Sequence, residues 1–173
     1  GYYDYNAAAD AIVQILGRKK NVLELGIGTG LLAEKLIQRG LDVSGFDFSK
    51  SMLEIAVRRL GTQVKLYEQD VTDLNLPETY VAALSHGGVW VGIEGKNCID
   101  SHITDYERNL EGLRRVAKHL LPNGLLIIGI QHEHKNCSGV ALGDGSTYSS
   151  KVDFQEDLIY KRHLVEREDK VLA

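Results

Sequence analysis

The chain has 173 residues, of which 43% are hydrophobic and 25% charged, a balance that suits one globular domain with a single core. Its net charge of −4, and a longest basic cluster of only Arg18-Lys19-Lys20, argue against a nucleic-acid-binding surface. Apolar runs are shorter than the ~18 residues of a membrane span, no signal-peptide pattern is present, and Cys98 and Cys137 lack metal or redox spacing. We therefore expect a cytoplasmic protein that binds neither nucleic acid nor membrane.

The N-terminal segment places tyrosines directly before an amphipathic helix. Apolar residues at helical spacing predict this helix over residues 7–16. Its predicted buried side consists of Ile12, Val13, Ile15 and Leu16. A tyrosine ring attracts cations and its hydroxyl bonds carboxylates, so Tyr3 and Tyr5 are candidates for a lid over a charged ligand. The alternative is that both tyrosines only pack against the helix or against a neighbouring chain.

The next segment is an apolar run that ends in an acid and three alternate glycines. It reads Val22-Leu23-Glu24-Leu25-Gly26-Ile27-Gly28-Thr29-Gly30 and predicts a strand, a ligand-binding turn and a helix over residues 31–39. Leu31 stands where a dinucleotide-binding pattern has its last glycine, so the spacing does not favour a pyrophosphate. Gly26, Gly28 and Gly30 let a ligand approach the backbone, and the helix start binds a carboxylate as readily as a phosphate. With Glu24 as acceptor for a cation, the turn fits an amino-acid-like group; a tight turn without ligand is the alternative.

A second predicted strand, over residues 41–47, also ends in a carboxylate. Asp47 lies about twenty residues beyond the glycine turn, where an acid accepts the hydroxyls of a ribose. A helix over residues 51–60 follows, and Phe48 and Met52 near its start are candidates to cover an adenine ring. Both residues fit the hydrophobic core equally well.

A third predicted strand, over residues 64–70, ends in Asp70. This carboxylate can accept a hydrogen bond from an exocyclic amino group, or it can simply cap a turn. The carboxyl ends of parallel strands share one edge of the sheet, so we expect Glu24, Asp47 and Asp70 to converge on one ligand.

Four runs, "VLELGIGTG", "GFDFSKSML", "YEQDVTDL" and "LLPNGLLIIGI", together resemble class I S-adenosylmethionine-dependent methyltransferases over about residues 20–131. The resemblance implies that Glu24, Gly26, Gly28 and Gly30 hold the methionine moiety of S-adenosylmethionine. It implies that Asp47 takes the ribose hydroxyls and that Asp70, with the backbone of Val71, takes the adenine. The implied activity is methyl transfer, by in-line displacement, to nitrogen or oxygen of a small molecule. The spacing also resembles N-methyltransferases that act on amino sugars.

The strand predicted over residues 80–85 leads into a loop at the same edge of the sheet. Ser85 is a candidate to line the methionine tail, and Trp90 to form a wall of the substrate pocket. His86 is a candidate general base, which methyl transfer needs only when the nucleophile carries a proton. The alternative for His86 is a loop histidine bonded to backbone.

Two further histidines follow the strand predicted over residues 125–131. His132 and His134 are candidates to contact substrate as acid, base or hydrogen-bond partner. Together with Cys137 they make a poor structural zinc pattern, so no metal site is predicted.

Alternation over residues 148–154 and 158–168 predicts a C-terminal β-hairpin. We expect it to be a substrate-side insertion, with completion of the main sheet as the alternative. The predicted fold is α/β: a three-layer sandwich with a central, mostly parallel Rossmann-like sheet plus this hairpin. The whole, residues 1–173, is expected to be a single methyltransferase domain. Its parts are an N-terminal lid and helix (1–20), a cofactor-binding core (21–131) and a substrate-side loop and hairpin (132–173).

The chain begins at Gly1 without Met and ends at Ala173, so we expect a truncated sequence. Its substrate pocket is then either incomplete in one chain or completed by a second copy in a homodimer. This leaves open a non-catalytic or partner-dependent module that only binds the cofactor. A nicotinamide-dependent oxidoreductase is disfavoured, because the third glycine of its pattern is missing and no Tyr-x-x-x-Lys pair occurs.

Overall fold

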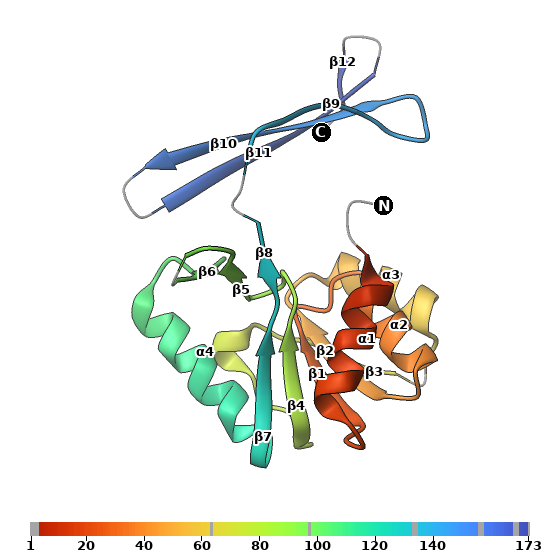
Figure 1. Cartoon of the computed structure of the whole chain (residues 1–173), viewed down its shortest axis with the longest axis vertical. Coiled ribbons are helices and arrows are strands. Elements are labelled where there is room, and N and C mark those ends of the chain that lie inside the picture. Colours follow the sequence, from red (N-terminus) through yellow and green to blue (C-terminus); the bar gives the residue numbers. More distant parts are fainter. Residues whose placement is uncertain are drawn as a thin grey trace. The chain divides into compact units, whose positions relative to one another are not determined.

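The computed structural model describes residues 4–62, 64–96, 98–132, 135–155, 158–167 and 170–172 (Figure 1). The chain divides into two compact units, Gly1–Gln131 and His132–Ala173, which we describe separately. In the described part of the chain, no helix has the length and apolar character needed to cross a membrane.

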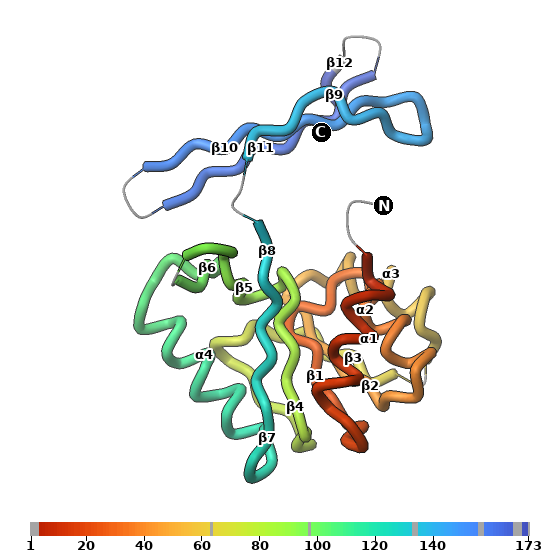
Figure 2. Tube along the Cα trace, viewed as in Figure 1, coloured from red at the N-terminus to blue at the C-terminus, as the bar shows by residue number. Residues whose placement is uncertain are grey.

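A five-stranded sheet forms the centre of the first unit, in the order β3-β2-β1-β4-β7, and every neighbouring pair is parallel. Its strands are β1 (Asn21–Leu25), β2 (Asp42–Asp47), β3 (Lys65–Glu68), β4 (Tyr80–Ser85) and β7 (Leu120–Ile128). The helices are α1 (Tyr5–Leu16), α2 (Leu31–Gln38), α3 (Lys50–Leu60), α4 (Tyr106–Lys118) and the short 3₁₀ helix η1 (Val71–Asp73). Helices α1, α2 and α3 cover one face of the sheet and α4 the other (Figures 1 and 2).

Alternate residues of the central strands face two separate hydrophobic cores. In β1, Val22 packs in the core under α1, α2 and α3, whereas Leu23 packs in the core on the α4 side. Ala82 and Ala83 of β4 divide in the same way. Successive side chains of a strand point to opposite faces, so a strand buried on both faces must be apolar throughout. The predicted three-layer sandwich with a parallel sheet is confirmed.

Helix α1 begins earlier than predicted, because Asp4 caps it by accepting hydrogen bonds from the backbone N–H groups of Asn6 and Ala7. Its buried residues are Ala9, Ile12 and Leu16. The prediction that Ile15 is buried was wrong: its side chain is 57% exposed.

Strand β7 begins at Leu120, not at Leu125, and so includes Pro122-Asn123-Gly124. The register with β4 shifts across this stretch, from Leu120 opposite Tyr80 to Leu125 opposite Ala82. Asn123 has a φ of 62°, the left-handed conformation that asparagine tolerates better than most residues. Proline, asparagine and glycine, which are typical of turns, therefore form an irregularity within a strand here.

A small sheet that the sequence analysis did not predict completes the first unit. Its order is β6-β5-β8, with β5 (Trp90–Ile93) antiparallel to β6 (Ile99–Ser101) and parallel to β8 (Ile130–Gln131). Strand β8 follows β7 after a break at Gly129.

The second unit is a four-stranded antiparallel sheet in the order β12-β11-β10-β9. Its strands are β9 (Cys137–Ala141), β10 (Thr147–Gln155), β11 (Leu158–Arg167) and β12 (Lys170–Val171). The predicted hairpin is β10 and β11, paired in register from Thr147 opposite Glu166 to Gln155 opposite Leu158. The alternative that it completes the main sheet was wrong, because the hairpin belongs to a sheet of its own. Its predicted position on the substrate side stays a prediction.

Candidate active site at the carboxyl edge of the parallel sheet

The three glycines of the turn after β1 have different surroundings. All have positive φ: 64° at Gly26, 55° at Gly28 and 76° at Gly30. A Cβ added to Gly26 would lie 3.0 Å from the Cα of Gly88, and one added to Gly30 would lie 2.8 Å from a methyl of Leu60. A Cβ added to Gly28 would meet nothing within 4 Å. Gly26 and Gly30 therefore allow the turn to pack closely against its neighbours, whereas Gly28 borders open space.

Asp47 ties the glycine turn to the start of α3. Its side chain is buried, and its Oδ2 accepts from the Gly28 backbone N–H at 2.9 Å, while its Oδ1 accepts from the Ser49 N–H at 2.9 Å. A carboxylate offers about four lone-pair positions, so two bonds leave capacity for the hydroxyls of a ribose. The residue that the sequence predicts as a ribose ligand also holds the turn together.

Arg59 of α3 supports the same turn from a position that the sequence analysis missed. Its Nε donates to the carbonyl oxygen of Thr29 at 2.9 Å. Nothing in the local pattern around Arg59 marks it for this role, because the contact joins α3 to a turn that lies thirty residues earlier.

Glu24, the second-to-last residue of β1, carries a buried carboxyl group and is 5% exposed. Burial raises its pKa to about 8, and the backbone N–H of Ala33 in α2 opposes this rise. Its Oε2 is buried and has no hydrogen-bond partner among the described residues. Such an atom is costly unless a ligand provides a donor, so the environment of Glu24 suits a cationic or hydroxyl-bearing group.

Asp70 caps the short helix η1. Its Oδ1 accepts from the backbone N–H of Thr72 at 2.8 Å and from the Thr72 hydroxyl at 2.7 Å. The bond from the Thr72 hydroxyl is the main cause that lowers the pKa of Asp70, with a smaller effect of the nearby Arg108. The side chain of Val71 is buried in the core on the α4 side, so this residue can meet a ligand only through its backbone.

Phe48 and Met52 are exposed at the start of α3, next to Asp47. Their exposed fractions are 77% and 42%, respectively. The alternative that they belong to the hydrophobic core was therefore wrong. Two uncovered apolar side chains beside a carboxylate are suited to contact the flat face of a ligand.

The loop from His86 to Val89 is closed by Ser85. This serine is 1% exposed, and its Oγ donates to the Trp90 carbonyl at 2.7 Å and accepts from the Trp90 N–H at 2.8 Å. Because its single hydroxyl proton is used there, the Ser85 hydroxyl has no proton left to donate to a methionine tail.

Trp90 itself is 3% exposed and packs in the core on the α4 side, where its Nε1 donates to Asn109 Oδ1 at 2.9 Å. The prediction that Trp90 forms a pocket wall was wrong, because an indole this large is more stable when buried with its N–H bonded.

Gly88 brings the same loop onto the glycine turn. A Cβ at this position would clash with the backbone carbonyl oxygens of Leu25 and Gly26. The two loops therefore touch backbone to backbone, which only glycine allows. The sequence analysis missed this residue, although paired glycines directly after a strand were a signal for a close approach.

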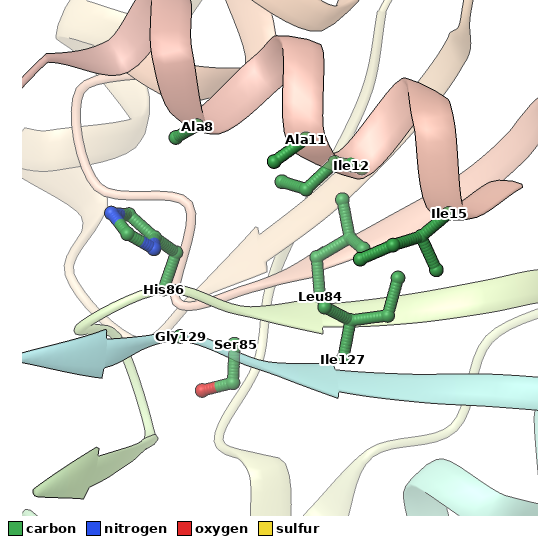
Figure 3. Close-up of a pocket in the computed structure, with 9 residues that line it drawn as sticks. All are labelled: Ala8, Ala11, Ile12, Ile15, Leu84, Ser85, His86, Ile127 and Gly129. Carbon is green, nitrogen blue, oxygen red and sulfur yellow. The ribbon is translucent and has the colours of Figure 1, made fainter. Parts of the chain in front are cut away.

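His86 lies at one end of a cavity of about 160 Å³ between α1 and strands β4 and β7, with Ile15 at the other end (Figure 3). The residues that line this cavity are Ala8, Ala11, Ile12, Ile15, Leu84, Ser85, His86, Ile127 and Gly129. The ring of Tyr5 contacts His86 edge to face, with ring centres 6.4 Å apart at an angle of 73°. Burial lowers the pKa of His86, which favours the neutral imidazole that a general base requires.

No observation places the remaining candidate residues, Tyr3, His132 and His134, at this edge of the sheet. Tyr3 and His134 lie outside the described residues. His132 is exposed and belongs to the second unit. Within the described residues, no group of three or more His, Cys, Asp or Glu side chains is arranged to hold a metal ion.

Comparison with known proteins agrees with this geometry. Residues 22–124 match the model of the methyltransferase domain family. The chain belongs to this family. It is 30% identical over 130 residues to an uncharacterized methyltransferase of Bacillus licheniformis, covering 73% of this chain and 53% of the relative.

A second relative is a dTDP-4-amino-2,3,4,6-tetradeoxy-D-glucose N,N-dimethyltransferase of Saccharopolyspora spinosa. This methyltransferase domain is 29% identical to it over 133 residues, which cover 72% of the chain and 47% of the relative. The chain thus spans about half the length of the curated relatives it matches.

Solved structures show the same fold. An S-adenosylmethionine-dependent methyltransferase from Clostridium acetobutylicum superposes with a TM-score of 0.73 at 22% identity, over 98% of this chain and 71% of the other. A sugar N-methyltransferase from a Streptoalloteichus species gives a TM-score of 0.73 at 19% identity, over 97% and 69% of the two chains.

Proposed function

We propose that this methyltransferase domain binds S-adenosylmethionine at the carboxyl edge of its parallel sheet and transfers a methyl group to nitrogen or oxygen of a small molecule. The observation that carries the proposal is the turn at Gly28. Its backbone faces open space, it is held by the buried Asp47, and the unpartnered Oε2 of Glu24 lies in the strand that leads into it. This combination suits a ligand with a carboxylate, an ammonium and a diol.

Each part of the cofactor has candidate residues. We assign the methionine moiety to Glu24 and the backbone at Gly28, with Gly26 and Gly30 shaping the turn. We assign the ribose to Asp47. The adenine is assigned to Phe48, Met52, Asp70 and the Val71 backbone. Tyr5 and the backbone of Ser85 are assigned to the methionine end.

Bound S-adenosylmethionine supplies a methyl group on a cationic sulfur. The residues of this chain then hold an acceptor in line, exclude water and remove a proton where the nucleophile carries one. His86 is the candidate for that last role, because it is half-buried, its pKa is lowered by burial, and it ends a cavity that reaches the same edge. We propose an amino sugar as the class of acceptor, since one relative is named as an N,N-dimethyltransferase of an amino sugar.

We also propose that the two units act as one methyltransferase domain in the cytoplasm. The sequence feature that supports this location is the pair of cysteines, which are both free thiols.

Isothermal titration calorimetry with S-adenosylmethionine, S-adenosylhomocysteine and NAD tests the proposal. Gly28→Ala is compared with Gly40→Ala, because both glycines have positive φ and open space where a Cβ would lie. Both variants place alanine at a positive φ, but Gly40 lies after α2 and outside the turn that follows β1. We expect Gly28→Ala to weaken S-adenosylmethionine binding by at least about tenfold, or about 1.4 kcal/mol, and Gly40→Ala to leave it unchanged.

Three outcomes decide the matter. Preference for NAD would contradict the proposal, as would equal binding by the two glycine variants. Binding of S-adenosylmethionine without methyl transfer to any amine or hydroxyl acceptor would favour a module that only binds the cofactor.

A further inference from the structure

The imidazole of His86 lies directly against the backbone of Gly129, the residue between β7 and β8. The two residues occupy the same end of the cavity (Figure 3). The Gly129 N–H donates to the carbonyl oxygen of Ser85 at 2.8 Å, and its own carbonyl accepts from the Gly92 N–H at 2.9 Å. Hydrogen bonds on both sides hold this stretch of backbone in place, so the ring rests on a fixed surface.

A side chain at position 129 would displace that ring. A Cβ there would lie 2.5 Å from His86 Nδ1 and 3.3 Å from its Cε1. Gly129 is not among the glycines with positive φ, so its backbone conformation is open to any residue. The imidazole, not the backbone, therefore excludes a side chain at position 129.

The other sides of the ring are also restricted. Tyr5 meets it edge to face from α1, and the bonds between Ser85 and Trp90 fix both ends of the loop that carries it. Gly88 holds the same loop on the glycine turn. Among the described residues that line the cavity, His86 is the only histidine, and the ring of Tyr5 contacts it.

We propose that Gly129 is a positioning residue for methyl transfer, because the missing side chain at this position allows the His86 imidazole to rest at the end of the cavity that lies at the carboxyl edge of the sheet. The proposal rests on the proposed role of His86 as the proton acceptor. Displacing the ring by even 1 Å is enough to slow a reaction that depends on orientation.

The test compares Gly129→Ala with Gly92→Ala in the 173-residue chain. Gly92 lies on the neighbouring strand β5, also without positive φ, and alanine there keeps the N–H that bonds the Gly129 carbonyl. A Cβ at position 92 would meet the side chain of Ile130 at 3.3 Å and the Gly129 carbonyl oxygen at an ordinary contact distance of 3.6 Å, and no histidine is among its nearest neighbours. The readout is the NMR resonance of the His86 Cε1 proton, assigned by its loss in His86→Gln, and its titration midpoint.

In Gly129→Ala we expect the resonance to move, because the ring changes its distance from Tyr5. The midpoint should rise toward that of an ordinary histidine, because burial is what lowers it. Gly92→Ala should change neither. Calorimetry should give the same S-adenosylmethionine affinity for both variants and the parent chain. With a dTDP-4-amino sugar as acceptor probe, kcat should fall by about tenfold to a hundredfold in Gly129→Ala alone.

An unchanged His86 resonance and midpoint in Gly129→Ala would overturn the positioning role. If the ring has moved in Gly129→Ala but kcat is unchanged, the position of the His86 ring does not matter for methyl transfer and the proposal fails. If Gly129→Ala does not fold, the double variant His86→Ala/Gly129→Ala replaces it: this variant should fold, because the ring that the added Cβ would meet is gone, and its failure to fold would overturn the role given to the ring. Failure of S-adenosylmethionine binding in the parent chain would refute the proposed function, and the NMR comparison would still decide whether Gly129 positions the ring.

Discussion

At the scale of single residues, the buried carboxyl group of Glu24 makes stability depend on pH. A carboxyl group in the unfolded chain titrates near 4.5, whereas burial raises the pKa of Glu24 to about 8 in the folded chain. Between these values the folded chain retains a proton that the unfolded chain releases. The contribution of Glu24 to the free energy of unfolding therefore falls as pH rises through this window and levels off above pH 8.

Glu24→Gln should remove this pH dependence. We expect the variant to match the parent chain near pH 4 and to be more stable at pH 8, with the gap growing by about 1.4 kcal/mol for each pH unit at most. Urea unfolding at pH 4, 6 and 8 measures the difference. The control is Glu54→Gln, which removes a carboxyl group that is exposed rather than buried. Parallel curves for Glu24→Gln and the parent chain would show that Glu24 is ionised in the folded protein.

At the scale of elements, the loop between β4 and β5 depends on one hydroxyl. Ser85 accepts from the Trp90 N–H and donates to its carbonyl, so one side chain replaces the backbone bonds that the loop lacks. These two hydrogen bonds hold the loop where Gly88 contacts the glycine turn and where His86 lies at the end of the cavity.

Ser85→Ala should destabilise the fold by about 1–3 kcal/mol, because it leaves the backbone groups of the buried Trp90 without partners. Chemical unfolding followed by the fluorescence of Trp90, the only tryptophan, measures the loss. Ser51→Ala serves as the control: its hydroxyl bonds only to Ser49 at 3.0 Å on the exposed start of α3, so the change should stay within about 0.5 kcal/mol. Equal losses in the two variants would contradict the role given to Ser85.

At the scale of the whole molecule, the first unit contains both hydrophobic cores. Every residue of the two core clusters lies between Tyr5 and Ile128. In the second unit, the strand ends expose apolar side chains, among them Phe154 (56%) and Tyr160 (48%). The stability of the cofactor-binding part should therefore come from the first unit.

A fragment of residues 1–131 should consequently fold and bind S-adenosylmethionine within about threefold of the longer chain, a difference of about 0.7 kcal/mol. Circular dichroism with thermal unfolding and calorimetry check both points. A fragment that is unfolded, or that binds much more weakly, would show that the second unit is needed for cofactor binding.

Much of the fold was predictable, because its signals are local. The acid and alternate glycines after an apolar run predicted β1, its turn and α2, and the spacing to Asp47 predicted β2. Alternation predicted the hairpin of β10 and β11 within one residue of its observed limits. Strand β7 was misjudged at its start, since Pro122 and Gly124 give the same local signal in a helix end and in an irregular strand.

The sequence by itself thus determined the family, the strand-end acids and the glycine turn, all of which depend on residue type and spacing along the chain. Only the tertiary structure decided what each of these residues contacts. It separated Gly28 from Gly26 and Gly30, exposed Phe48 and Met52, buried Trp90, and placed His86 against Gly129. Those outcomes depend on which distant backbone or side chain fills the neighbouring space, and close packing between segments leaves no trace in the local pattern.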